Sequence, residues 1–193
     1  MLLALHFFFA VISSKFTSLK CVVYHVHKKL FTVKLISRNV KIHLYKTLIR
    51  PIVTYASETW IFKESICKEL MIFERKIMRK VFGPTRTEEG YWRIKTNQEI
   101  NDILKGENII GFIKKQRLNL LGHVERMSED NNVKKIYRWK PLAQRPIGRP
   151  KIRWEDDVSE DMKRLNVRNW KKITHDRVRW KKVVEQARTL QRL

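Results

Sequence analysis

Apolar residues recur every three or four positions through much of the chain, and this period is most regular between residues 65 and 82. The apolar positions of that segment would line one face of a helix: Ile66, Leu70, Phe73, Ile77 and Val81. Gly83 and Pro84 predict where the helix ends. Because 43% of the residues are hydrophobic and only 6 Gly and 5 Pro occur, the chain can bury a core. The pattern predicts a mainly α fold.

Shorter helices are expected on both sides of this segment. One begins near Asn39 and should end or kink at Pro51, because proline lacks the N–H that a helix interior needs. Residues 51–62 carry aromatic and β-branched side chains without a clear period. We favour a helical continuation there, with a short buried strand as the alternative. Another helix is expected to follow a cap at Thr96 or Asn97.

A longer helix is predicted over residues 109–127. Its apolar face would contain Ile110, Ile113, Leu118, Leu121 and Val124. Its cations are expected to be exposed: Lys114, Lys115 and Arg117. Gly111 and Gly122 each cost roughly 1 kcal/mol relative to alanine inside a helix, so we expect close packing at both positions.

Residues 154–193 predict a pair of helices. Asp156 and Asp157 would lie in the first turn of the first helix, where the helix dipole favours carboxylates. Polymerases also use paired aspartates to hold metal ions, but such a pair needs a tight hairpin between apolar strands. The helix start is therefore the better interpretation. From Asn169 onward, apolar and aromatic residues at helical spacing predict a single second helix.

The chain carries 42 Lys and Arg against 19 Asp and Glu, which gives a net charge of +23. Every charged residue in the segment 133–154 is a Lys or an Arg, and the segment contains three prolines and a glycine. This composition predicts a linker or arm without regular structure. The excess charge predicts an anionic partner, and nucleic acid is the default one.

Candidate contacts to nucleic acid come from the 65–82 helix and from the arm. The candidate phosphate contacts are Arg75, Lys76, Arg79, Lys80, Lys134, Lys135, Arg138, Lys140, Arg145, Arg149, Lys151 and Arg153. The candidate faces for stacking on unpaired bases are Tyr137, Trp139 and Trp154. The alternatives are a solvated face for the helix, and a flexible basic linker or nuclear-import signal for the arm.

Motifs for catalysis or metal binding are absent from the sequence. It contains no GxSxG, P-loop, HExxH or GxGxxG, and Cys21 and Cys67 lack the spacing of a zinc site. His123 is expected to be a core or capping residue, because one histidine without a nearby carboxylate or cysteine does not define a site. We therefore predict no cofactor, no metal and no small-molecule substrate.

The N-terminal run MLLALHFFFAVI has the length of the apolar core of a signal peptide but no basic residues before it. It is too short to span a bilayer. A buried strand or helix, or an accidental start on a truncated reading frame, is the alternative to a secretion signal. We expect a nuclear or cytoplasmic location, with secretion as the lesser alternative.

Six blocks of sequence together resemble the C-terminal region of endonuclease-reverse transcriptases from non-LTR (LINE-type, jockey- and RTE-like) retrotransposons. The blocks are LYKTLIRPIVTYASETW (44–60), FERKIMRKVFGP (73–84), WRIKTNQEI (92–100), LLGHVERM (120–127), RPIGRPKIRWEDDV (145–158) and NWKKITHDRVRWKKVVEQA (169–187). Their order and spacing are more specific than any single block. The resemblance covers roughly residues 33–193.

In that family these blocks follow the palm that carries the catalytic aspartates, and form a thumb and a basic tail thought to hold template and primer. The resemblance thus implies four segments: residues 1–34 of unclear role, a thumb-like helical region at 35–132, a basic arm at 133–153 and a C-terminal helical pair at 154–193. The family's endonuclease domain and YxDD-type polymerase motif are absent from this sequence. We therefore expect no enzymatic activity, although full-length members are RNA-directed DNA polymerases.

The resulting hypothesis is a catalytically incomplete reverse-transcriptase fragment that binds RNA or DNA of the template and primer type without sequence preference. A complete reverse transcriptase acting in trans is a candidate partner. The alternatives are a non-functional or domesticated remnant without nucleic-acid binding, and a secreted cationic protein that acts on membranes.

Overall fold

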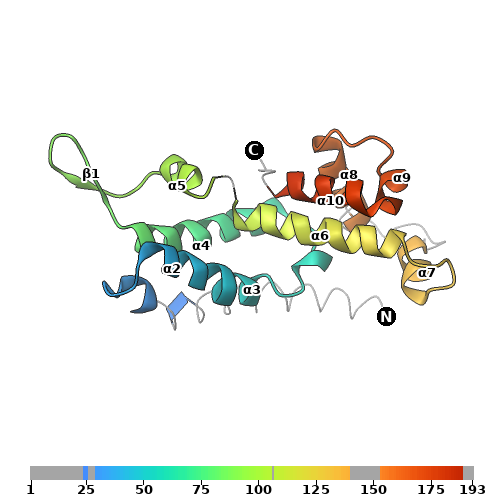
Figure 1. Ribbon diagram of the computed structural model, residues 1–193, viewed down its shortest axis with the longest axis horizontal. Coiled ribbons are helices and arrows are strands. Elements are labelled where there is room, and N and C mark those ends of the chain that lie inside the picture. The colour runs from blue at the N-terminus through green and yellow to red at the C-terminus, as the bar shows by residue number, and fades with distance from the viewer. Residues whose placement is uncertain (1–23, 26–28, 106, 140–152, 189–193) are drawn as a thin grey trace, which may run out of the picture. The chain divides into compact units, whose positions relative to one another are not determined.

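The computed structural model describes residues 24–25, 29–105, 107–139 and 153–188 (Figure 1). The chain divides into two compact units, of which the first contains Met1–Tyr55 and Glu69–Lys105 and the second contains Ala56–Lys68 and Gly106–Leu193. Helices dominate both units, which confirms the mainly α fold. The division differs from the predicted segments, because residues 107–132 group with the C-terminal helices and not with the preceding thumb-like region.

In the first unit, helical backbone continues through Pro51. Helix α2 (Arg38–Leu44) runs into a π-helical turn (Tyr45–Ile49) and then into α3 (Arg50–Val53). The Arg50 N–H donates to the Tyr45 carbonyl, five residues back. This wider turn lies directly before the proline and accommodates its missing N–H and bulky ring. Of the two predicted outcomes at Pro51, an end or a kink, the helix does not end there, and the favoured helical continuation extends to Val53.

Helix α4 (Glu64–Phe82) matches the predicted 65–82 helix, and four of its five expected apolar positions are buried. The buried ones are Leu70, Phe73, Ile77 and Val81. Gly83, with φ 71°, adopts the left-handed conformation that commonly ends a helix. The hydroxyl of Tyr45 donates to Glu74 Oε1 at 2.8 Å, and both side chains are buried. Burial and the neighbouring Glu74 carboxylate raise the pKa of Tyr45.

A hairpin and a capped helix complete the first unit. Strands β1 (Thr85–Arg86) and β2 (Trp92–Arg93) pair antiparallel, with Thr85 opposite Arg93. Helix α5 (Asn97–Ile103) begins with a capping box, in which the Thr96 hydroxyl accepts from the Glu99 N–H and the Glu99 carboxylate accepts from the Thr96 N–H. The predicted cap is thus confirmed at Thr96.

The second unit packs α8 (Trp154–Arg164), α9 (Trp170–His175) and α10 (Arg177–Ala187) against α6 (Ile109–Glu125), as Figure 1 shows. It also contains a short 3₁₀ turn (Ser57–Thr59) and α7 (Asn132–Arg138). The shared core contains Leu118, Leu121, Val158, Met162, Trp180, Val183, Val184 and Ala187. This core is what positions the charged side chains described below.

Two secondary-structure predictions for this unit were wrong. Helix α7 occupies the beginning of the predicted arm, whose three prolines and glycine all fall later, among residues that the structure does not describe. The expected single C-terminal helix is two helices, because the Asp176 carboxylate accepts from the Val178 and Arg179 N–H groups and starts α10 afresh. Aspartate at this position thus overrides the continuous helical spacing.

The close packing predicted at the glycines of α6 is confirmed. A Cβ on Gly111 would lie 1.9 Å from the Arg188 carbonyl oxygen, and a Cβ on Gly122 would lie 2.1 Å from Trp180 Nε1. The Trp180 indole N–H donates to the Leu118 carbonyl at 3.1 Å, so this edge of the ring approaches α6 where Gly122 leaves room. In the part of the chain that the structure describes, no helix is both long and apolar enough to cross a membrane.

Candidate nucleic-acid interface

Two cations of α6 that the sequence predicted to be exposed are buried. Lys114 and Arg117 are 2% and 0% exposed. Arg117 Nη2 donates to Asp157 Oδ2 at 2.8 Å, and Lys114 Nζ lies 3.1 Å from Asp161 Oδ1. Both aspartates lie on α8, one turn apart. The periodicity failed here because it reports where apolar side chains lie and cannot foresee a carboxylate partner some 40 residues away in the sequence.

Further contacts hold the Arg117 guanidinium in place. It lies over the Phe62 ring, 4.9 Å from its centre, and Asp157 Oδ2 also accepts from the Phe62 N–H at 2.8 Å. A planar guanidinium that is bonded to a carboxylate and stacked on a ring has little freedom to move. The group is therefore part of the core and unavailable to an external phosphate.

The paired aspartates of α8 are confirmed as residues of a helix start. Asp156 Oδ2 accepts from the Arg153 N–H at 3.1 Å, across the first turn. Asp157 is 5% exposed and bonded to Arg117. Within the described residues, no group of three or more His, Cys, Asp or Glu side chains is placed to hold a metal ion.

The predicted contacts on α4 differ in exposure. Lys76 and Lys80 are exposed, and the Lys76 ammonium lies 4.2 Å from the centre of the Tyr24 ring. Arg75 and Arg79 are partly buried. The Arg79 guanidinium donates to the Lys95 carbonyl and to the Asn97 side chain. Arg79 thus links α4 to the segment before α5, whereas Lys76 and Lys80 stay available.

The first part of the predicted arm is used partly for internal contacts. Lys134 is 4% exposed, and its ammonium donates to the carbonyls of Glu125 and Met127 at 2.9 and 2.7 Å. It therefore caps the C-terminal end of α6. Glu129 pairs with both Lys134 and Arg138, and the hydrogen bond from Lys134 lowers the pKa of Glu129. Among the described cations of the arm, Lys135 alone keeps an exposed side chain without such a contact to the unit.

The predicted stacking residues separate into one exposed and two partly buried rings. Trp139 is 68% exposed. Trp154 is partly buried, and its indole N–H donates to the Glu58 carbonyl at 2.8 Å. Tyr137 packs edge-on against Trp154, with ring centres 6.2 Å apart, and burial raises the pKa of Tyr137. Lys134 and Trp154 serve the packing of the unit itself, so we leave both out of the interface proposed below.

Arg153 is partly buried at the start of α8. The other predicted contacts of the arm lie outside the described residues: Lys140, Arg145, Arg149 and Lys151.

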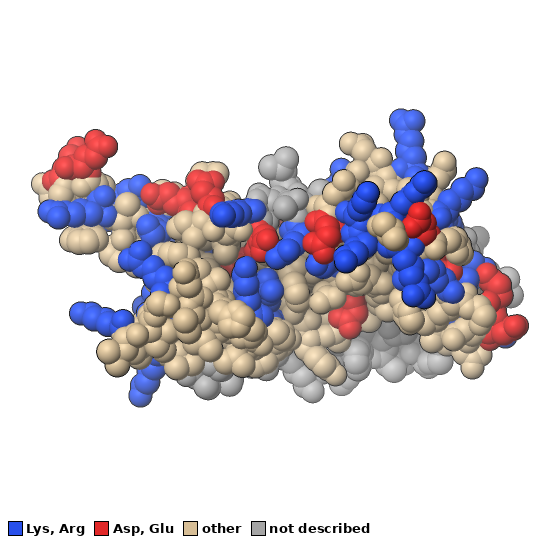
Figure 2. Space-filling model, in the orientation of Figure 1, with Lys and Arg blue, Asp and Glu red and all other residues tan. Residues whose placement is uncertain are grey.

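Among the described residues of the second unit, the densest group of exposed cations was not among the predicted contacts. It lies on α9 and α10 and in the turn before them, and we call it the α9–α10 basic surface. Its members are Arg168, Lys171, Lys172, Arg177, Arg179, Lys181 and Lys182, all exposed. Asp176 is the single carboxylate between Arg168 and Lys182. Figure 2 shows Lys and Arg side chains gathered over these helices.

The sequence contained a signal for this surface. Trp170, Ile173 and Trp180 are spaced as a buried helix face, and the cations occupy the positions between them. His123 also differs from expectation, because it is exposed on α6 and neither belongs to the core nor caps a helix. To predict this surface and the exposure of His123, one would have to know which helices pack together.

Comparison with known proteins adds one relative. The chain is 24% identical over 158 residues to a Caenorhabditis elegans protein named "Putative uncharacterized transposon-derived protein". The match covers 79% of this chain and 56% of the relative, so the chain spans little more than half of that protein. This similarity supports a transposon origin. No family model and no solved structure matches the chain.

The clustered cations of the α9–α10 basic surface give this side of α9 and α10 a strongly positive potential. The buried ion pairs hold α8 against α6, the helix on which α9 and α10 also pack.

Proposed function

We propose that the chain is the C-terminal part of a non-LTR retrotransposon reverse transcriptase and binds RNA or DNA without sequence preference. The six resembling blocks and the transposon-derived relative support the origin. The observation that best supports nucleic-acid binding is the α9–α10 basic surface, with seven exposed cations and one carboxylate over 15 residues. A polyanion that meets such a surface releases condensed counterions, and this release drives binding irrespective of sequence.

Other exposed groups of the second unit extend the proposed interface, because Lys135 lies on α7 and Trp139 directly after it. Lys76 and Lys80 on α4 belong to the first unit and are separate candidate contacts. The exposed indole of Trp139 offers a face for an unpaired base, and such stacking tolerates any sequence. We therefore place single-stranded template or primer among the candidate partners, with a complete reverse transcriptase supplying catalysis in trans.

The test is a salt titration of binding. The full chain is mixed with labelled 20-nucleotide single strands of random sequence, as RNA and as DNA, and affinity is measured by fluorescence anisotropy at several salt concentrations. The logarithm of the affinity should fall linearly with the logarithm of the salt concentration. The double variant Lys171→Gln/Lys172→Gln should bind more weakly to every sequence and reduce the slope by about 2.

A matched control removes the same charge elsewhere. Lys29 and Lys34 are exposed in the first unit and lie outside the proposed interface. Their double glutamine variant should change affinity and slope less than the α9 variant does. Wild-type protein that binds neither strand at low salt would contradict the proposal.

A remnant without binding activity is the second candidate, and the hairpin of the first unit favours it. Tyr91, Trp92 and Ile94 are 72%, 68% and 73% exposed, which is unusual for three large apolar side chains so close together. Such a group is typical of a surface that has lost a packing partner. Absence of binding to either strand at low salt would favour this second candidate.

A further inference from the structure

We infer that the pocket between α6 and α10 is a specific binding site for a phosphate group of a nucleic-acid strand. This inference rests on the proposed function and assigns it a site. The pocket is lined on the α6 side by His123 and Arg126 and on the α10 side by Arg177 and Lys181. No carboxylate among the described residues lines it. A concave site with three permanent cations and an imidazole suits a doubly or singly charged phosphate.

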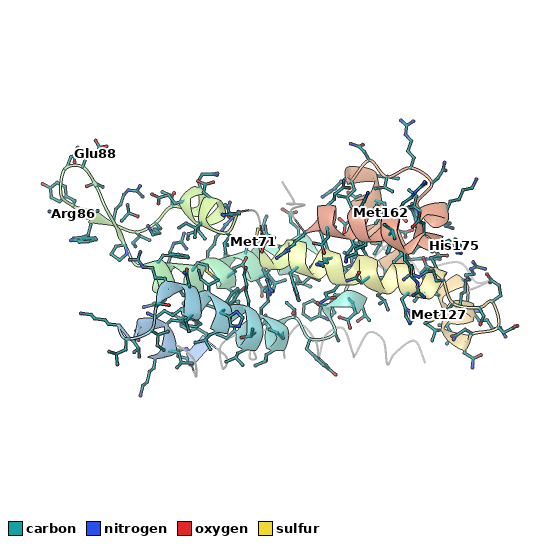
Figure 3. All side chains as sticks on the ribbon, in the orientation of Figure 1. Met71, Arg86, Glu88, Met127, Met162 and His175 are labelled. Carbon is teal, nitrogen blue, oxygen red and sulfur yellow. The ribbon has the colours of Figure 1, made fainter. Side chains whose placement is uncertain are left out.

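Helical spacing brings these residues to one place. Asn119, His123 and Arg126 are four and three residues apart, so they share a face near the C-terminal end of α6. Arg177 and Lys181 are four residues apart and share a face of α10. Figure 3 marks this end of α6 with Met127 and the neighbouring end of α9 with His175. The two faces meet where α6 and α10 pack together, and residues of both line the pocket.

Gly122 and Trp180 set the spacing between the two faces. Trp180 also lines the pocket, one position before Lys181 and three after Arg177. Its indole bonds to the Leu118 carbonyl, where only a glycine at position 122 allows such an approach. Because the indole is 3% exposed and bonded to the α6 backbone, the cations next to it in sequence start from a well-ordered position. A preformed site of this kind binds with less loss of conformational freedom.

Contacts within the protein orient the polar groups of the pocket and leave hydrogen-bond donors for a ligand. Arg126 Nη1 donates to the Thr174 carbonyl at 2.8 Å, which fixes the guanidinium and uses one of its five N–H groups. The carboxylate nearest in sequence to Arg177 is Asp176, which is occupied by the Val178 and Arg179 N–H groups and by an ion pair with the Arg179 guanidinium. The carboxylate nearest in sequence to Lys181 is Glu185, one turn later on α10, and it pairs with Lys115 at 2.6 Å. Neither carboxylate lines the pocket.

A nucleic-acid phosphate is the occupant that the surroundings favour. The pocket opens within the α9–α10 basic surface, so a strand that follows the exposed cations passes over it. A phosphate seated between Arg177 and Lys181 would receive charge-assisted hydrogen bonds, whereas Lys172 and Lys182 act only as nearby charges. The pocket would thus fix the register of the strand on the protein without reading its bases.

The first arm of the test compares two variants with equal loss of charge. Arg177→Gln/Lys181→Gln removes cations of the pocket, and Lys172→Gln/Lys182→Gln removes cations of the same basic surface outside it. With a 20-nucleotide single strand at fixed salt, the pocket variant should lose roughly ten-fold more affinity than the other variant, because it also loses hydrogen bonds to a charged group. Both variants change exposed residues, and circular dichroism checks that both fold. Equal losses would overturn the inference while leaving the proposed function intact.

The second arm uses inorganic phosphate as the probe, at constant pH and ionic strength. Histidine ring resonances of the full chain are followed by NMR, with His123 assigned from the His123→Gln variant and the exposed His43 of α2 as the internal control. His123 should shift to saturation, and the shift should disappear in Arg177→Gln/Lys181→Gln. Parallel, non-saturating shifts of His123 and His43 would overturn the site. Saturation by phosphate with no binding of any strand would overturn both the nucleic-acid occupant and the proposed function.

Discussion

Helices α6 and α10 belong to the same unit and carry cations between apolar residues in similar patterns, yet they use those cations in opposite ways. On α6, Lys114 and Arg117 are buried, whereas on α10, Lys181 and Lys182 are exposed. Nothing in the two helices alone explains the difference. The explanation lies on α8, whose Asp157 and Asp161 meet α6.

The comparison shows that the net charge overestimates how many cations are available to a polyanion. Lys114, Arg117 and Lys134 all count toward the charge of +23, but each is neutralised or bonded inside the unit. The cations of α9 and α10 have one carboxylate among them and face solvent. A buried cation stabilises the fold only as long as its partner remains, while an exposed one acts on whatever approaches it.

The largest effect should come from removing a buried cation. Arg117→Ala leaves the Asp157 carboxylate buried without its guanidinium, and breaking a buried pair in this way costs about 3–5 kcal/mol. Unfolding of the full chain in denaturant, followed by circular dichroism, measures the change. Lys182→Ala on α10 is the matched control and should change the free energy of unfolding by less than about 0.5 kcal/mol.

A double-mutant cycle sharpens this prediction. If the two residues act as a pair, the double variant Arg117→Ala/Asp157→Ala should lose clearly less free energy of unfolding than the sum of the two single variants. Each single variant leaves one buried charge without its partner, whereas the double variant leaves none. Strict additivity would mean that Arg117 acts mainly through its packing on Phe62. In either case the Lys182 variant should show its effect on nucleic-acid affinity and not on stability.

A smaller effect is expected where α6 and α10 touch. Gly122→Ala places a Cβ 2.1 Å from Trp180 Nε1, so the indole must move and its bond to the Leu118 carbonyl weakens. Overpacking of this kind typically costs about 1–3 kcal/mol. Asn119→Ala, at an exposed position one turn earlier on the same helix, should be neutral or slightly stabilising. Equal free energies of unfolding for the two variants would contradict the close contact.

The helices themselves were largely predictable from the sequence. The spacing of Leu70, Phe73 and Ile77 located α4, and the Thr96 cap located α5, because both depend on residues within one or two turns. The two glycines of α6 also correctly predicted close packing, although the sequence did not indicate that Trp180 packs at Gly122. Local chemistry was thus readable wherever the partner was local.

The errors share a single physical origin in non-local or competing contacts. Arg117 was misplaced because its partner lies on another helix, and α9 and α10 were merged because the cap at Asp176 competes with an otherwise continuous period. The π-helical turn before Pro51 is another such compromise. For the candidate site, residue type alone could not separate the buried Lys134 from the exposed Lys135, since only the fold decides which of them reaches the end of α6.

The smallest effect should come from an ion pair at the surface. Arg93 forms a two-pronged pair with Glu99, at 2.7 and 3.0 Å. The hydrogen bond from Arg93, followed by that from the Thr96 N–H, lowers the pKa of Glu99 to about 2. A carboxylate whose pKa is depressed in the folded state stabilises it above the unfolded pKa, near 4.5, and this contribution is lost as the pH falls toward 2.

Arg93→Ala should therefore raise the pKa of Glu99 part of the way toward its ordinary value, with the Thr96 N–H still holding some of the shift. Carboxyl resonances followed by NMR between pH 2 and 6 would measure it, and Arg86→Ala on β1 should leave the pKa in place. At pH 7 the unfolding midpoint should hardly change, because water already solvates both partners. A large loss of stability would mean that an exposed cation can stabilise the fold as strongly as a buried one. The contrast between α6 and α10 would then need another cause.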